Sequence, residues 1–341
     1  MDIRTLSKKL GLSITTVSRA LGGYSDVSEK TRKRIKQFAA KYKYSPNPYA
    51  SKLASGKSNT IGFVLPLYGL NSNNLNQTSF FEFIAGMTNK IHSENLQFFM
   101  MFVNSPQEEK KAYEKLIYVQ KVDKIILHNL KKNDSRITIL KKNNIKFVTW
   151  GRTQGLKNYS WVDLDNEGSV NLIMKYLIEK KHSNIAYINI FENYNFAYQR
   201  QQGYIKSLKK YKIKYNKNYY LAVKTEEPEE SAELIKKMLV KNRQITALIC
   251  STEYSAVGAI KACNELNKKI GKNIAIITFD GPVVELLTNP ALTSITHPRK
   301  KLGLKAIEML IDMDKKDYQH RSFLAKPEIV ERGTVHSLNK K

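Results

Sequence analysis

The sequence predicts an α/β protein with a small three-helix head at the N-terminus and a long core built on parallel sheets. Helix-spaced apolar residues with capping signals fill roughly the first 45 residues, and a proline-flanked segment follows them. After that segment, strand-length apolar runs alternate with helical patterns. The chain has 341 residues, so the part after the head is long enough for two lobes, each with its own core.

The first 45 residues have the pattern of a helix-turn-helix. Two leucines four residues apart lie on one face of the first helix, which Gly11 interrupts. Ser13 offers an N-cap oxygen to a second helix, in which Val17 and Leu21 pack inward together with Ala20. A third helix begins after Ser28, and its apolar stripe closes the core with Ile35, Phe38 and Ala39.

The second helix leaves a short polar face that suits the major groove of DNA. This face consists of Ile14, Thr15, Thr16, Ser18 and Arg19, and Arg19 is its one long side chain that can donate two hydrogen bonds to the same base. A small helical domain with an unrelated function is the alternative for this segment taken alone.

The segment after the head predicts a hinge that gains order on DNA. Pro46 and Pro48 precede a run at 49–55 that has helical spacing but little apolar area, so it should be largely unfolded alone in water. Two such segments side by side in a minor groove could each insert Leu53 as an apolar wedge, and Ala50 would allow their close approach.

The segments IRTLSKKLGLSITTVSRALGG and YSPNPYASKLASGKS, in this order, resemble the LacI/GalR family of bacterial transcription regulators. The resemblance implies a homodimer that binds a double-stranded DNA operator and a small-molecule effector through a periplasmic-binding-protein-like core. It assigns base reading to Ile14, Thr15 and Arg19, phosphate contacts to Ser13, Thr16, Ser18, Thr31 and Asn47, and the wedge to Leu53, beside Ala50 and Lys52. Ser51 stands where many members have Arg or Gln, and Ile14 suits a thymine methyl group.

The charge distribution agrees with DNA binding in the head. The formal net charge is +27, and residues 1–58 hold 13 Lys and Arg against 3 Asp and Glu. The remaining 283 residues hold 44 against 27, so charge per residue is nearly three times higher in the head. We expect the surplus of the core to be mostly solvated lysine, and DNA binding to fall steeply with salt.

Several classes of protein are disfavoured by what the sequence lacks. The two cysteines, Cys250 and Cys263, are 13 apart without a CxxC pattern, which indicates buried thiols in a reducing cytoplasm. No signal-peptide pattern or 18-residue apolar run is present, so we expect a cytoplasmic, nucleoid-associated bacterial protein with no membrane contact. No catalytic or metal-binding motif is present, so we expect no enzymatic activity, no cofactor and no metal. The C-terminal part has no heptad repeat, so we do not expect a tetramer held by a coiled coil.

The core shows a βαβ rhythm, which predicts parallel sheets with helices on both faces. The apolar runs begin at 61, 96, 122, 146, 184, 245 and 273 and read IGFVLPL, LQFFMMFV, VDKIILHN, KFVTWGR, NIAYINI, ITALICS and NIAIITFDG. Helical patterns pass through Phe83 and Met87 and begin again at Pro106. Ligands of such sheets bind beyond the carboxyl ends of the strands.

The resemblance also implies the domain boundaries. They are a head at 1–45, a hinge at 46–58 and a core at 59–341, with an N-lobe at about 59–160 and 292–322 and a C-lobe at about 161–291 and 323–337. The three crossovers between the lobes are expected near 159–162, 289–293 and 320–325.

Residues just past the strand ends are the candidates for effector contact. Most of them are either aromatic or charged. They are Tyr68, Phe80, His128, Trp150, Arg152, Tyr194, Phe196, Arg200, Thr252, Glu253 and Asp280. Sugars need both kinds, because their C–H faces stack on rings while their hydroxyls need paired donors and acceptors. By resemblance, Arg200 and Asp280 match the regular effector-contacting pair, and Thr252 stands where several sugar-responsive members have Asn. Tyr68, Phe196 and Glu253 could equally have a packing role within one lobe and no contact with the effector.

The phrases FVTWGR, YSWVDLDN and FAYQRQQGY are similar to the branch of the family that controls α-glucoside use. The resemblance then implies a repressor that a sugar releases from a pseudo-palindromic operator by closing the cleft between the lobes. A purine or nucleoside effector is the alternative, since Trp150 could stack on a base, and so is a ligand that acts as corepressor. A low-specificity architectural DNA protein and a sugar-binding module without regulatory role are further alternatives.

Overall fold

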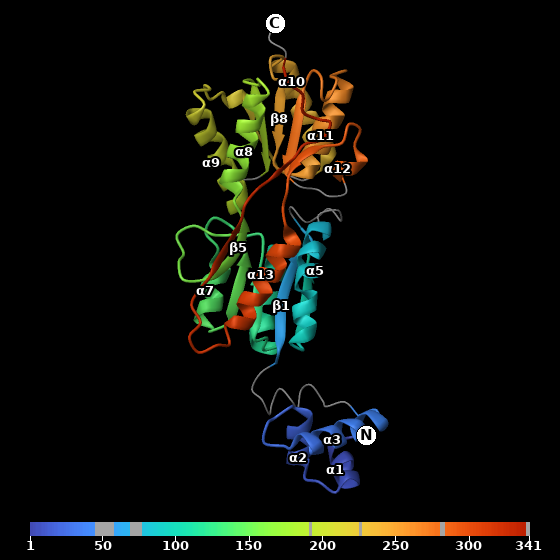
Figure 1. Cartoon of the computed structure of the whole chain (residues 1–341). Coiled ribbons are helices and arrows are strands. Elements are labelled where there is room, and N and C mark those ends of the chain that lie inside the picture. Colours follow the sequence, from blue (N-terminus) through green and yellow to red (C-terminus); the bar gives the residue numbers. More distant parts are fainter. Residues whose placement is uncertain (45–57, 69–76, 191–192, 225–226, 280–283, 339–341) are drawn as a thin grey trace. The chain divides into compact units, whose positions relative to one another are not determined.

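The computed structural model describes residues 1–44, 58–68, 77–190, 193–224, 227–279 and 284–338. The chain divides into two compact units, Met1–Asn59 and Thr60–Lys341, which are described separately (Figure 1).

The N-terminal unit is a three-helix head. Its helices are α1 (Ile3–Leu10), α2 (Ile14–Leu21) and α3 (Glu29–Lys41). Gly11 adopts a left-handed conformation with φ of 66° and ends α1. The side chains of Ser13 and Ser28 accept hydrogen bonds from the backbone N–H groups of Thr16 and Thr31, three residues further on, at the starts of α2 and α3, as the capping pattern predicts. Val17 and Ile35 lie in a core with no solvent exposure, so the predicted head fold is confirmed.

The second unit contains two parallel sheets. The first has the strand order β11-β5-β4-β3-β1-β2. Its strands are β1 (Thr60–Pro66), β2 (Gln97–Val103), β3 (Lys124–Leu127), β4 (Lys146–Trp150), β5 (Ser160–Leu164) and β11 (Ser322–Ala325). The helices around it are α5 (Gln77–Ser93), α6 (Pro106–Glu114), the π-helical turn η3 (Lys115–Val119), α7 (Ser135–Lys142) and α13 (Arg299–Asp312). We call this part the N-lobe.

The second sheet has the strand order β12-β10-β9-β8-β6-β7, and only the β10–β12 pair is antiparallel within it. Its strands are β6 (Ile185–Ile190), β7 (Tyr220–Val223), β8 (Ala247–Cys250), β9 (Ala275–Phe279), β10 (Thr293–Ile295) and β12 (Ile329–Val330). The helices around it are α8 (Asn166–Glu179), α9 (Asn195–Lys210), the 3-10 turn η4 (Lys217–Tyr219), α10 (Pro228–Lys241), α11 (Glu253–Glu265) and α12 (Val284–Leu287). We call this part the C-lobe.

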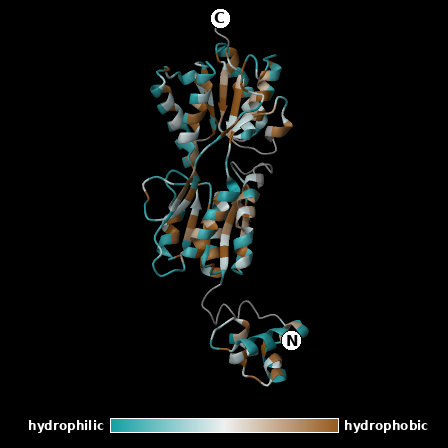
Figure 2. Ribbon diagram, in the orientation of Figure 1, coloured by the Kyte–Doolittle hydropathy of each residue, from teal (hydrophilic) through white to brown (hydrophobic). Residues whose placement is uncertain are grey.

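Hydropathy explains why these segments pack as they do. The central strands are mainly hydrophobic, while the helices are hydrophilic on their outer faces (Figure 2). Strands β3, β6, β8 and β9 are buried at every position, as expected for strands covered by helices on both faces. The predicted α/β class with two parallel-sheet lobes is confirmed.

The chain passes between the lobes after β5, after β10 and after β11. The structure places these passages a few residues further along than the expected crossovers at 159–162, 289–293 and 320–325. The reason is that β11 pairs with β5 as far as Ala325 and Leu164, the last residues of the two strands, while β10 pairs with β9 in the C-lobe. Such pairing between segments far apart in sequence leaves no local signal.

Helices α5 and α13 pack with their backbones in direct contact. A Cβ atom on Gly86 would lie 1.9 Å from the backbone oxygen of Lys300, and one on Gly303 would lie 1.9 Å from that of Phe83. The two glycines therefore let the helices approach closely, and the start of α13 lies beside the middle of α5.

Candidate functional site

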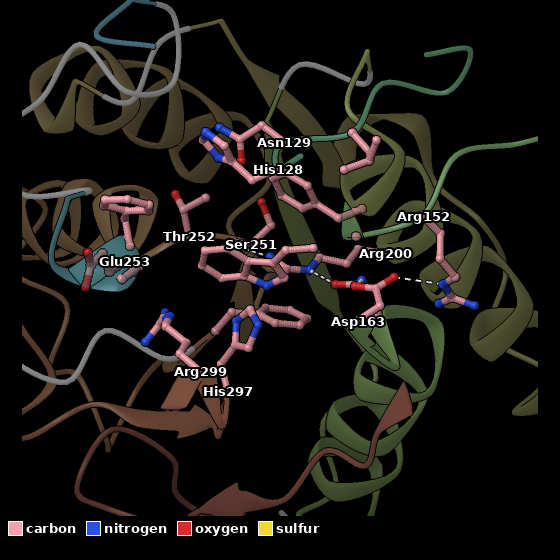
Figure 3. Close-up of a pocket in the computed structure, with 18 of the residues that line it drawn as sticks. His128, Asn129, Arg152, Asp163, Arg200, Ser251, Thr252, Glu253, His297 and Arg299 are labelled. Carbon is pink, nitrogen blue, oxygen red and sulfur yellow. Dashed lines mark hydrogen bonds and ion pairs between the residues drawn. The ribbon is translucent and has the colours of Figure 1, made fainter. Parts of the chain in front are cut away.

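A cavity of about 190 Å³ lies between the two lobes, at the carboxyl ends of both sets of strands. Side chains from both lobes point into it (Figure 3). Parallel sheets concentrate their loops at this edge, which is why the chain can place polar groups from many segments around one space.

Arg200, on α9, is a buried and fixed donor in this cavity. Its Nε donates to Asn166 Oδ1 at 2.9 Å, and its Nη1 donates to the backbone oxygen of Ser251 at 2.5 Å. The guanidinium carbon lies 3.6 Å from the ring centroid of Phe279 and 5.0 Å from that of Phe196. Ring contacts and hydrogen bonds together hold the guanidinium plane in one orientation.

Asp163, at the end of β5, continues this network into the N-lobe. Its Oδ2 accepts a hydrogen bond from Arg152 Nε at 2.7 Å, and its Oδ1 accepts from the backbone N–H of Leu164 and from Asn166 Nδ2. Burial raises the pKa of Asp163 above its usual value, although the charge of Arg152 opposes the shift. A continuous chain of polar contacts thus runs from Arg152 in one lobe to Arg200 in the other.

His128 follows β3 and contributes a neutral imidazole. Its ring stacks on Phe63 at 4.7 Å, and its Nε2 lies 3.1 Å from the backbone oxygen of Val64. Burial lowers the pKa of His128 to about 4, so the ring is neutral at pH 7. Because a carbonyl oxygen can only accept, Nε2 carries the proton and Nδ1 is left as an acceptor.

A buried ion network supports the strand end that carries His128. Arg136 Nη2 donates to the backbone oxygens of His128 and Asn129 at 3.0 and 3.2 Å. The same guanidinium pairs with Asp134 and Glu109, both at 2.7 Å. The network therefore fixes one wall of the cavity from behind.

Aromatic rings form a second wall. Trp150 stacks on Phe83 with centroids 4.3 Å apart and planes 2° from parallel, and His297 meets its edge at 6.1 Å. Phe80 packs on Phe63 at 4.6 Å. The indole is held flat by its neighbour, as a stacking platform requires.

His297, two residues before α13, and Arg299, its first residue, line the cavity, and neither is among the residues predicted from the sequence. Burial and the charge of Arg299 hold the pKa of His297 well below its usual value. Arg299 is buried and its Nη1 lies 3.2 Å from Glu82 Oε2 on α5. These residues follow β10, a strand of three residues, which is too short for an apolar run to reveal. Asp163, Asn166, Ser251 and Phe279 were missed as well, although each adjoins or lies in a segment quoted above.

Most of the expected effector residues come together around this cavity. Those that line it are Phe80, His128, Trp150, Arg152, Phe196, Arg200, Thr252 and Glu253. Thr252 also caps α11, where its side chain accepts from the backbone N–H of Ser255.

Two expected residues, Tyr68 and Tyr194, do not appear in the lining. Tyr68 instead donates its hydroxyl to Glu109 Oε2 at 2.5 Å, in the supporting network. Tyr194 precedes α9 and forms a backbone bridge with Lys131. Asp280 lies outside the described residues.

The head presents the polar face expected on α2. Ile14 is 45% exposed, and Thr15, Ser18 and Arg19 are exposed, while Val17 and Ala20 are buried. The hydroxyls of Ser13 and Thr16 lie 2.8 Å apart, and Thr31 forms the matching pair with Ser28 at the start of α3. The expected hinge contacts lie outside the described residues and are Asn47, Ala50, Lys52 and Leu53.

The described residues contain neither a candidate membrane-spanning helix nor a candidate metal-binding cluster. No helix there has the length and apolar character needed to cross a membrane. No cluster of His, Cys, Asp and Glu there could hold a metal ion, and Cys250 and Cys263 are both buried free thiols.

Comparison with known proteins gives matches in both units. Residues 4–47 match the bacterial regulatory proteins of the lacI family, and residues 174–335 match the periplasmic binding protein-like domain. The HTH-type transcriptional regulator AglR of Rhizobium meliloti (strain 1021) is 30% identical over 344 residues, which cover 98% of this chain and 94% of AglR. The HTH-type transcriptional repressor PurR of Aliivibrio fischeri (strain ATCC 700601 / ES114) is 26% identical over 338 residues, 98% of each chain.

Among solved structures, the lac repressor dimer bound to operator and the anti-inducer ONPF has the same fold. Its TM-score is 0.83 at 21% identity, with 98% of this chain and 99% of that chain covered.

Proposed function

Because the chain belongs to the LacI family, whose members are DNA-binding transcription regulators and not enzymes, we propose that it represses transcription at a pseudo-palindromic operator and is released by a sugar. Members of the family bind operators and small-molecule effectors as dimers. The proposed domains are the head at 1–45, the hinge at 46–58 and the two-lobed core from 59 onward. The protein would act on the chromosome, in the cytoplasm.

The observation that carries the sugar proposal is that two of the arginines lining the cavity are each paired with a carboxylate. Arg152 is paired with Asp163, and Arg299 is paired with Glu82. Neutral His128 adds an acceptor, and the stacked Trp150 adds a flat apolar surface. Arginines that are already paired with carboxylates, beside a flat aromatic face, suit an uncharged, polyhydroxylated ligand better than a phosphate or carboxylate.

The α-glucoside class is proposed from the three segments FVTWGR, YSWVDLDN and FAYQRQQGY. They supply Trp150, Arg152, Asp163 and Arg200, which contribute much of the polar lining. A purine is the second candidate, because relatives named PurR match over the same length and the Trp150–Phe83 stack would also receive a base.

The dimer is supported by exposed apolar side chains in each lobe of the core. Phe81 and Phe102 in the N-lobe are 54% and 55% exposed, and Leu286 and Leu287 in the C-lobe are 69% and 79% exposed. The two residues of each pair lie on one element or on consecutive elements of a lobe, and such side chains are candidates for a surface that a second copy would bury.

The proposed mechanism couples the cavity to the DNA. A sugar held by both lobes favours the closed cleft, the N-lobes of the dimer shift, and the hinge pair no longer fits the central minor groove. Coupling of this kind is about 1 to 3 kcal/mol and would weaken operator binding about 5- to 150-fold.

Calorimetry with the full chain tests the effector class. Maltose, isomaltose and cellobiose are compared with hypoxanthine and guanine, and each compound that binds is then added to a complex of the protein with a selected DNA site. Binding of an α-glucoside that lowers DNA affinity supports the proposal. Binding of a purine alone, or a ligand that strengthens DNA binding, contradicts it.

A further inference from the structure

Arg19, the long donor on the exposed face of α2, is held by two side chains from the turn that follows this helix. Its Nε donates to Asp26 Oδ2 at 2.6 Å, and its guanidinium carbon lies 4.7 Å from the ring centroid of Tyr24. The side chains of Arg19 and Asp26 remain 44% and 51% exposed, so the pair lies at the surface.

The turn that carries these two residues is itself well fixed. The backbone N–H of Tyr24 donates to the backbone oxygen of Arg19 at 3.1 Å, and Arg32 from α3 donates to the oxygens of Gly23 and Tyr24 at 3.3 and 3.4 Å. Gly22 leaves room for the Tyr24 ring, because a Cβ there would lie 3.0 Å from it. Buried Val27 anchors the far end of the turn beside Asp26.

This arrangement leaves one edge of the guanidinium for a ligand. Nε is used by Asp26, and neither Nη1 nor Nη2 forms a hydrogen bond to any residue that the structure describes. The Nη1–Nη2 edge presents two parallel N–H donors, which match the N7 and O6 acceptors of guanine in the major groove. The Tyr24 ring restricts rotation of that edge out of plane.

We propose that Asp26 and Tyr24 are specificity-determining residues, which hold Arg19 in the orientation that reads a guanine. The inference rests on the proposed function, in which α2 enters the major groove.

The charge of Asp26 has a second consequence for base reading. A carboxylate near DNA repels the phosphates, so it weakens binding to any sequence. The same carboxylate neutralises Arg19 and reduces the gain from pairing this arginine with a single phosphate. Asp26 therefore lowers general affinity while it favours contact with a base edge.

The test begins with the full wild-type chain and a random duplex DNA pool, from which binding sites are selected. Duplexes with every single-base change in one half-site are then titrated with wild type, Asp26→Ala, Asp26→Asn and Tyr24→Ala. Glu29→Gln is the matched control, because Glu29 is another well-exposed carboxylate of the head and pairs only with Lys33 in the described structure. Thermal unfolding of each variant checks that the head remains folded.

We expect wild type to lose about 5- to 150-fold in affinity when one G·C pair is replaced. In Asp26→Ala the discrimination between bases should nearly disappear at that position and remain unchanged at the others. The slope of log affinity against log salt should become steeper by about one, because Arg19 then contacts a phosphate. Asp26→Asn keeps an acceptor oxygen and should retain part of the discrimination. Glu29→Gln should raise affinity for all sequences equally.

Full discrimination in Asp26→Ala and Tyr24→Ala would overturn the inference and leave the proposed function intact. If wild type selects no site from the pool, the proposed function fails, and the inference fails with it.

Discussion

Arg152 and Asp163 form an ion pair of 2.7 Å at the base of the interlobe cavity, and the two partners are unequally buried. The side chain of Asp163 is 7% exposed, whereas that of Arg152 is 26% exposed. The carboxylate therefore depends more on the pair than the guanidinium does, since it has less access to water.

This inequality predicts that the two single substitutions differ in cost. Arg152→Met leaves a buried carboxylate without its counter-charge and should lower the free energy of unfolding by about 2 to 4 kcal/mol. Asp163→Asn should cost less, because Arg152 can reach solvent. The double variant should recover part of the loss, and urea unfolding of all three measures the coupling. Equal costs for the two single variants would contradict the unequal dependence.

Arg200→Ala should abolish the effector response while operator binding remains. A lost charged hydrogen bond of about 1.5 to 3 kcal/mol corresponds to a roughly 10- to 150-fold weaker ligand affinity. Calorimetry with the identified sugar measures the affinity, and a DNA titration measures operator binding. Lys206→Ala, which removes an exposed cation of the same helix paired with Glu167, is the control. Undiminished sugar affinity in a folded Arg200→Ala protein would remove Arg200 from the site.

His128 predicts a specific dependence of stability on pH. Its pKa is lowered from 6.5 to about 4, so between these values the unfolded chain binds more protons than the folded one. The contribution of His128 is therefore present above pH 6.5 and is lost as the pH falls toward 4.

Wild type should lose up to about 2 kcal/mol more than His128→Gln when the pH falls from 7 to 5. Urea unfolding at both pH values checks this difference, with the exposed His92→Gln as control. Parallel pH profiles for wild type and His128→Gln would show that His128 is not held neutral.

Leu53→Ala should weaken operator binding and reduce DNA bending, because the leucine is expected to act as the apolar wedge of the hinge. A phased gel-shift assay measures bending, and Ser51→Ala in the same segment is the control. Unchanged bending would count against the wedge.

Gly86→Ala should destabilise the core even though alanine favours helices. The added methyl would lie 1.9 Å from the backbone oxygen of Lys300, so α5 and α13 must separate. We expect a loss of about 1 to 3 kcal/mol in the free energy of unfolding, as for other overpacked sites. Asn89→Ala, at an exposed position one turn along α5, should cause little change. A Gly86→Ala protein as stable as wild type would show that the helices can shift without cost.

The sequence by itself determined the local elements of this protein. Caps such as Ser13 and Ser28, the left-handed Gly11 and the apolar periodicity of the long strands act within a few residues, so they can be read directly. The same signals indicated the order of head, hinge and core, and they placed His128 just past the end of β3, where the cavity lies.

Only the tertiary structure decided which of these residues meet. Asp163 faces Arg152, Arg299 faces Glu82, and Tyr68 faces Glu109 rather than the cavity, because the partners come from strands and helices far apart in the chain. The short strands β10 and β11 likewise form through pairing with strands distant in sequence. Contacts of this kind depend on the complete packing of both lobes, which no local pattern of residues records.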